Sequence, residues 1–159
     1  MSEPTADKYR IVTENTEERL SEKELVDHKS EMEAFVRWLD TVGKEPKKAE
    51  GYAYDTIRAT VYRIDKFYRW IWDREGGYVA PPTHEHADRY IAELAREDHT
   101  NAHKSTTRKC MLRYFKWRSH ERGGEKWETE MRFPRSNPQP RDYLTSEERP
   151  KIRRVALGY

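Results

Sequence analysis

Apolar side chains recur at helical spacing in four separate stretches of this 159-residue chain, and none of the stretches alternates as a strand does. The predicted helices span residues 21–42, 54–75, 84–97 and 105–122. Ser21 followed by Glu24 forms a capping box before the first helix, and Thr83 can cap the third. The sequence therefore predicts an all-α fold, a bundle of four to five helices.

Three less regular segments flank the predicted bundle, residues 18–124, which is the size of one domain. Residues 1–17 are polar without a sustained apolar period, so we expect a flexible N-terminal arm. Residues 125–144 contain three prolines and are predicted to be an extended linker. Residues 145–159 carry a helix-start signal, but Pro150 would cost about 3 kcal/mol inside a helix, so any helix there begins later.

The composition limits the classes of protein that remain. Nineteen aromatic residues can supply a core although only 35% of the chain is hydrophobic. Cys110 is the single cysteine, which excludes an intramolecular disulfide and suits a reducing compartment; we expect it to be a small buried side chain. No apolar run approaches 18 residues and no signal-type leader follows Met1, so the sequence predicts a cytoplasmic protein without a membrane span.

Positive charge is concentrated between residues 101 and 123, which hold seven Lys or Arg and one acid. This local charge of +6 stands in a chain whose total is +2. Such a concentration, with aromatic residues between the charges, is typical of a surface that binds a polyanion. Nucleic acid is the first candidate.

The fourth predicted helix separates its charges from its apolar residues. At 100° per residue, one arc collects Lys109, Arg113, Lys116 and His120. The opposite side holds Cys110, Met111, Tyr114, Phe115 and Trp117. We therefore expect the arc to face outward, with free backbone N–H groups at Ser105 and Thr106 available to a phosphate.

The second predicted helix offers a similar face opposite its apolar stripe: Thr56, Ala59, Arg63 and Lys66. Small residues beside Arg and Thr let a helix approach the edges of bases. Arg63 and Arg113 are the first candidates to read a base, since Arg pairs bidentately with guanine at roughly 1–3 kcal/mol of discrimination. The two helices are thus predicted to lie in neighbouring major-groove segments or along the phosphate backbone of duplex DNA.

Other functions remain open on the residues alone. A basic helix face is often simply solvated, and Trp70 could pack on another helix. A helical protein-interaction module would use an aromatic surface that includes Trp70, Trp117 and Trp127. The histidines follow no recognised zinc spacing, so we predict no metal site and no cofactor, and a metal-dependent nuclease ranks last. Paired carboxylates are better explained as helix caps, and no nucleophile constellation is recognised.

Three of the predicted helices resemble those of the N-terminal core-binding domain of tyrosine recombinases, the phage-type integrases with a SAM-like helical bundle. The resemblance lies in YDTIRATVYRIDKFYRWIW, like the family's T…Y…L..F..W helix, and in HADRYIAEL, like its short middle helix. It continues in KSTTRKCMLRYFKWRSHERGG, like the family's S..T….L..…F..W…..G helix. The segment RDYLTSEERPKIRRVAL looks like the entry to a catalytic domain, so the resemblance covers roughly residues 20–157.

In that family the core-binding and catalytic domains clamp duplex DNA, and helices like the second and fourth here face its grooves. Carried over by position, the resemblance implies DNA contacts from Thr56, Arg58, Arg63, Lys66, Lys104, Ser105, Thr106, Thr107, Lys109, Arg113 and Lys116. The family's catalytic Arg, Lys, His–x–x–Arg and Tyr motifs are absent, and residues 145–159 would only begin a catalytic domain. This chain alone is therefore not expected to be an enzyme.

The function expected from the resemblance is sequence-specific binding of double-stranded DNA as the core-binding domain of a site-specific recombinase. The expected partners are duplex DNA and other recombinase protomers, without a membrane or a small-molecule substrate. The expected location is the cytoplasm, on the nucleoid. A stand-alone DNA-binding regulator is the alternative.

Overall fold

The computed structural model describes residues 8–134, and this part of the chain is all-α, with five α-helices and no strand. The helices are α2 (Glu14–Arg19), α3 (Glu22–Thr41), the short 3-10 helix η1 (Pro46–Lys48), α4 (Tyr54–Glu75), α5 (His84–Arg96) and α6 (Asn101–Arg122). The described residues fall into two compact units, 8–98 with 106–131 and 99–105 with 132–134. The predicted fold class is confirmed.

Local signals in the sequence account for most helix boundaries. Ser21 and Glu24 form the reciprocal capping box at the start of α3, and Thr83 caps α5 through the backbone N–H of His86. Gly76 ends α4 in the left-handed conformation at φ +80°, which a residue without Cβ adopts at no steric cost. The α4 helix has the bounds predicted from the sequence, α3 is one residue shorter than predicted at each end, and α5 is one residue shorter at its C-terminal end.

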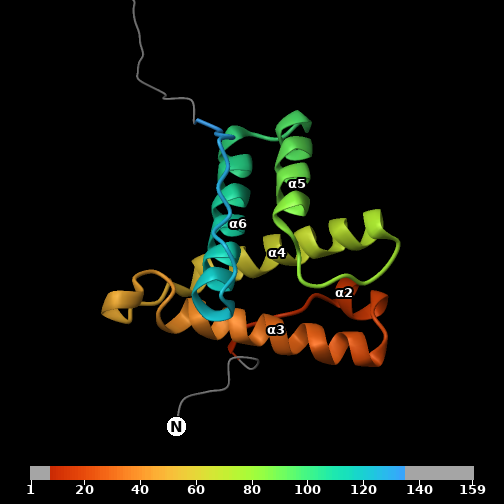
Figure 1. Cartoon of the computed structure of the whole chain (residues 1–159), viewed down its shortest axis with the longest axis horizontal. Helices are drawn as coiled ribbons and strands as arrows, with labels where there is room; N and C mark the ends of the chain where they lie inside the picture. The colour runs from red at the N-terminus through yellow and green to blue at the C-terminus, as the bar shows by residue number, and fades with distance from the viewer. Residues whose placement is uncertain (1–7, 135–159) are drawn as a thin grey trace, which may run out of the picture. The chain divides into compact units, whose positions relative to one another are not determined.

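The core of the larger unit is built from aromatic rings of three helices. Phe35 of α3, Phe67 of α4 and Trp117 of α6 are at most 1% exposed. The ring of Phe35 lies 5.3 Å from that of Tyr114, and Phe67 lies 6.4 Å from Phe115. Each fully buried ring contributes about 2–3 kcal/mol, so these contacts hold α6 against α3 and α4. Within this unit α5 and α6 stand side by side across α3 and α4 (Figure 1).

The N-terminal segment corrects the predicted arm. Residues 1–7 lie outside the described part, but from Lys8 onward the chain packs on the bundle and forms α2. Asp65 of α4, which is fully buried, accepts hydrogen bonds from the hydroxyls of Thr13 at 2.8 Å and Thr16 at 2.7 Å. It also pairs with Arg69 Nε at 2.9 Å. The arm looks flexible in sequence because its partner is a carboxylate about fifty residues away.

The predicted linker is described only as far as Pro134, and residues 123–134 contain neither helix nor strand. Its first part is nevertheless anchored. Trp127 is 4% exposed, its Nε1 donates to Asp88 at 2.8 Å, and its ring lies 5.7 Å from Phe115. Residues 145–159, where a last helix was considered, lie outside the described residues.

Candidate nucleic-acid interface

Arg113 is the most constrained cation of the predicted arc on α6. Its Nη1 donates to Thr60 Oγ1 at 3.1 Å, and its guanidinium lies 4.8 Å from the centre of the Tyr52 ring. Thr60 can accept this bond because its own hydroxyl hydrogen goes to the Thr56 carbonyl oxygen at 2.8 Å. The guanidinium of Arg113 is thus held between Thr60 of α4 and Tyr52, which precedes that helix. Most of its five N–H donors remain available to a ligand.

Lys116 and His120, further along the arc, also contact the bundle. Lys116 Nζ donates to the Gly43 carbonyl oxygen at 3.1 Å and lies 5.9 Å from the centre of the Trp38 ring. The indole N–H of Trp38 donates to His120 Nδ1 at 3.3 Å. The prediction of an arc that faces wholly outward is therefore corrected. Long basic side chains can cover aromatic surface with their stems, so the arc doubles as the seam between α6 and α3.

Lys109 and His120 are the two exposed members of the arc, and Lys109 is the exposed member that carries a fixed positive charge. It precedes Cys110, whose thiol is completely buried beside Thr60. Burial raises the pKa of the Cys110 thiol, and the Thr60 hydrogen bond and the Arg113 charge oppose this only in part. Cys110 is therefore a protonated packing residue, as the sequence indicated.

The first turns of α6 do not provide the predicted anion site. The helix begins at Asn101, four residues before the predicted start, because Thr100 caps it through the backbone N–H of His103. The backbone N–H groups of Ser105 and Thr106 therefore lie inside the helix, where they are committed to its own ladder. The prediction of a phosphate site at the backbone N–H groups of Ser105 and Thr106 is therefore wrong.

Two further residues assigned to DNA contact on α6 are covered. Lys104 is 8% exposed, with its ammonium 6.0 Å from the ring of Phe133, and Thr107 is 3% exposed. Both positions carry polar groups of the right kind, but neither presents a free surface. Ser105 and Thr106 are half-buried.

The α4 residues predicted to contact DNA separate onto two flanks of the helix. Lys66 is exposed, whereas Thr56 and Arg63 are half-buried on the side where Thr60 meets α6. The buried Nε of Arg63 has no hydrogen-bond partner among the described residues. Arg58 lies on the other flank, over the ring of Tyr54 at 5.7 Å, and so does not join the cations that adjoin α6.

Two sets of cations on α4 and α6 differ in their partners. The first set contacts carboxylates of Asp65, Glu93 or Glu31 and comprises Arg69, Arg74, Arg118 and Arg122. The second set makes no ion pair within residues 8–134: Arg63, Lys66, Lys109, Arg113 and Lys116. Arg58, on the other flank of α4, makes none either and is not counted in this set. We call this second set the unpaired cations. All five belong to the surface that the sequence predicted to contact DNA.

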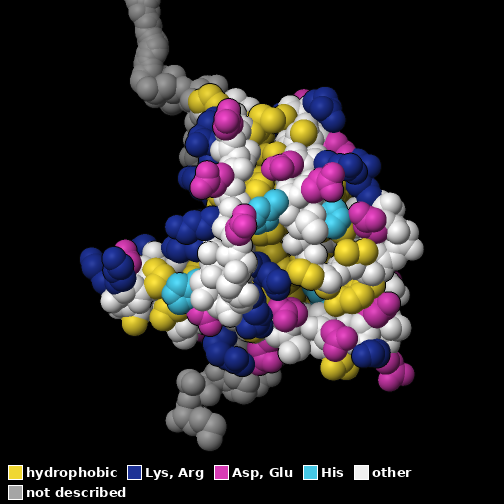
Figure 2. All heavy atoms as spheres, in the orientation of Figure 1, with side chains coloured by type: hydrophobic (Ala, Val, Ile, Leu, Met, Phe, Trp, Pro, Cys, Tyr) yellow, Lys and Arg dark blue, Asp and Glu magenta, His cyan; other side chains and the backbone are white. Residues whose placement is uncertain are grey.

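Four of the unpaired cations are related by helical spacing and by one contact between α4 and α6. Lys109, Arg113 and Lys116 follow one another at helical spacings of four and three on α6. Arg113 contacts Thr60 of α4, and Arg63 follows Thr60 by three residues. Figure 2 shows Lys and Arg side chains over η1 and beside α6, with Asp and Glu side chains among them there and over α5. A polyanion could supply the missing counter-charges.

The aromatic surface required by the protein-interaction hypothesis is not present. Trp117 and Trp127 are 1% and 4% exposed. Trp70 packs on α5, with its ring 5.1 Å from that of Tyr90 and its Nε1 donating to Glu93 at 3.3 Å. These three indoles are therefore used inside the fold.

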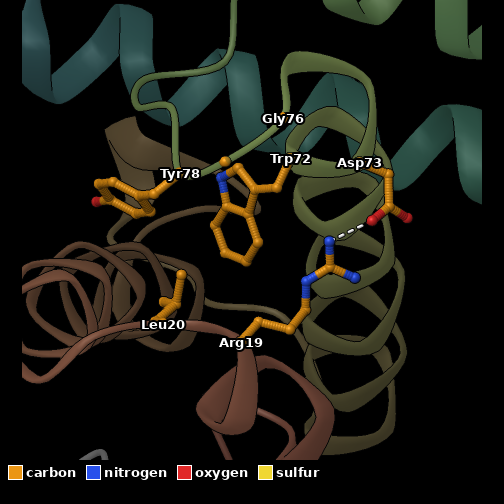
Figure 3. Close-up of a pocket in the computed structure, with 7 residues that line it drawn as sticks. Arg19, Leu20, Trp72, Asp73, Gly76 and Tyr78 are labelled. Atoms are coloured by element: carbon orange, nitrogen blue, oxygen red, sulfur yellow. Dashed lines mark hydrogen bonds and ion pairs between the residues drawn. The ribbon is translucent and has the colours of Figure 1, made fainter.

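A pocket of about 300 Å³ lies where α4 ends, between Arg19 and Tyr78 (Figure 3). The Trp72 ring points into it, and Arg19 pairs with Asp73 across one side. Its charged groups neutralise each other, so it offers no acid–base pair for chemistry. Elsewhere in residues 8–134, no group of three His, Cys, Asp or Glu side chains is placed to hold a metal ion. The helices in this range are also too short or too polar to cross a membrane.

Three residues that hold cations of the predicted arc were not identified from the sequence. Thr60, Tyr52 and Trp38 hold Arg113 and Lys116 through a hydroxyl and two rings. Thr60 follows Thr56 by one helical turn, which was a usable signal. The sequence contains no such signal for Tyr52 and Trp38, because their contacts depend on how α6 packs against the rest of the bundle.

Comparison with known proteins gives no relative: no family model, no curated sequence and no solved structure matches the chain.

Proposed function

We propose that this protein binds duplex DNA through the unpaired cations of α4 and α6. The observation that carries the proposal is the division of charge: the five unpaired cations, like Arg58 on the other flank of α4, have no carboxylate within residues 8–134, while four other cations on the same two helices have one. Phosphates release condensed counterions when such cations neutralise them, and this release favours binding.

The unpaired cations would play different parts. Lys66 and Lys109 are exposed and suit phosphate contacts, since an ammonium is a mobile point charge. Arg113 is fixed by Thr60 and Tyr52, so little side-chain entropy is lost when its remaining donors engage a phosphate or a guanine. We assign non-specific affinity to the two lysines and orientation on the duplex to Arg113.

A narrower proposal follows from the resemblance to core-binding domains. The protein would hold a recombination site for a tyrosine recombinase, together with other protomers, and strand cleavage would belong to a separate catalytic domain. The expected location is then the nucleoid in the cytoplasm. A stand-alone DNA-binding regulator would use the same surface.

The binding proposal is tested by titrating a labelled 20-base-pair duplex at 50 and 200 mM salt. With four or five phosphate contacts, affinity should fall by about 10²–10³ between these concentrations. Lys109→Ala should weaken binding by about five- to ten-fold and lower the salt slope by about 1. Arg89→Ala is the matched control, because it removes one charge from α5 that already pairs with Glu85. Absence of binding at 50 mM salt, or an equal loss in both variants, would contradict the proposal.

Selection of binding sites from a random duplex pool separates the two narrower roles. Recovered sites with two inverted copies at a fixed spacing would support assembly of several protomers, as a recombinase requires. Single isolated sites would favour the regulator.

A further inference from the structure

A groove of about 150 Å³ runs between the N-terminal segment and the flank of α4 that faces away from α6. Its lining residues are Tyr9, Arg10, Thr13, Arg58, Val61 and Tyr62. Tyr9 and Val61 are 3% and 4% exposed and form an apolar floor. The other side chains stand at its rim, so the groove is apolar at the bottom and cationic at the edge.

Tyr62 is unusual among the aromatic residues of the described chain. It is 57% exposed, and it is the one Phe, Tyr or Trp in residues 8–134 whose ring contacts neither another ring nor a cation. Tyr54, the other strongly exposed aromatic residue in this range, stacks on Tyr9 at 5.1 Å and carries the guanidinium of Arg58. The Tyr62 ring is therefore not occupied by another ring or cation and is available to a planar ligand.

Two arginines line the same groove as this ring. Arg58 precedes Tyr62 by one helical turn and makes no ion pair with the described residues. Arg10 is tied to the rim by Nε, which donates to the Val12 carbonyl oxygen at 3.2 Å, and its outer nitrogen lies 3.7 Å from Glu17. An anion attached to a planar group would meet a cation on either side of the groove.

We propose that the groove binds one unpaired nucleotide of single-stranded DNA, with its base stacked on Tyr62 and its phosphate held by Arg58. Aromatic rings beside cations are the usual platform for single strands, because every base has a face that stacks. A base inside a duplex is already covered on both faces, so only an unpaired base can enter. The site goes beyond the proposed duplex surface and lies on the other flank of α4.

The test compares two ligands at 50 mM salt: a fluorescein-labelled oligo(dA) of ten nucleotides and a duplex of the same length. Tyr62→Ala should weaken binding of the single strand by about ten-fold, since one stacked base is lost, and leave duplex binding unchanged. Tyr62→Phe keeps the ring and should restore single-strand binding. Val26→Ala is the control, because Val26 is also strongly exposed, at 67%, but lies on α3.

The possible outcomes separate this site from the duplex surface. Single-strand binding that depends on Tyr62 supports the groove even if the duplex does not bind, which would overturn only the proposed function. Equal single-strand affinity of Tyr62→Ala and wild type overturns the groove, whatever the duplex does. An equal loss in Val26→Ala, or no rescue by Tyr62→Phe, also overturns it.

Discussion

Acidification should destabilise the bundle through His28, which is 1% exposed on α3. Its ring packs edge-on against Tyr68 at 4.6 Å and Trp72 at 5.2 Å, and its Nε2 has no hydrogen-bond partner among the described residues. Burial lowers the pKa of His28 from 6.5 to about 4, against a smaller opposing effect of the Asp65 charge. The ring is therefore neutral in the folded protein at neutral pH.

Proton linkage gives the direction and the size of the change in stability with pH. Between pH 6.5 and 4 the unfolded chain binds a proton at His28 that the folded chain does not, so the free energy of unfolding falls as the pH falls. The stabilisation is fully present above about pH 6.5 and is lost through this window. At about 1.4 kcal/mol per pKa unit, the total is about 3 kcal/mol, and about 2 kcal/mol is already lost at pH 5.

The assay is urea unfolding followed by Trp fluorescence at pH 7, 6, 5 and 4.5, for wild type and His28→Phe. Phe cannot take a proton and fits an aromatic cluster, so the variant should keep about 2 kcal/mol more of its pH 7 stability at pH 5. Protonation of carboxylates affects both proteins alike and cancels in the comparison. Parallel loss of stability in the two proteins would refute the assignment to His28.

Two further stability predictions concern the packing around α4. Asp65→Ala should lower the free energy of unfolding, measured by urea titration, by about 3 kcal/mol, because Arg69 and two threonine hydroxyls lose a buried acceptor. The control is Asp55→Ala, an exposed change on the same helix, which should lower it by less than about 0.5 kcal/mol. Gly51→Ala should lower the free energy of unfolding, measured by thermal denaturation, by about 2 kcal/mol or more, because the new Cβ would lie 2.0 Å from the Asp40 carbonyl oxygen. Near-wild-type stability of either destabilised variant would contradict the corresponding contact.

Much of the secondary structure was predictable because its determinants are local. The apolar spacing of α4 and the glycines after it set both of its ends, and Ser21 and Thr83 satisfy the first N–H groups of α3 and α5. The predicted start of α6 at residue 105 is four residues late, because Thr100 falls between the predicted helices 84–97 and 105–122. Its hydroxyl acts on a residue only three positions away, so the signal was present in the sequence.

The N-terminal segment was not predictable in the same way. Residues 8–17 are polar on average, and their order depends on Asp65, whose charge is satisfied by Thr13, Thr16 and Arg69. The sequence pattern around a carboxylate in a helix does not show that its partners lie about fifty residues away. Burial of a charge is tolerated only where several donors converge, and convergence is a property of the tertiary structure.

By itself the sequence determined four of the five α-helices of the described residues, the apolar side of α6 and the concentration of positive charge on that helix. The helices and the apolar side of α6 depend on spacing along the chain, which helical geometry converts directly into faces, and the charge is a matter of composition. Only the tertiary structure decided how the charges are used: Lys109 remains in solvent, Arg113 and Lys116 are held against Tyr52 and Trp38, and Arg118 meets a carboxylate. The physical reason is that the environment of a long cationic side chain is set by the neighbouring helix, because its stem seeks apolar surface and its charge seeks a counter-charge.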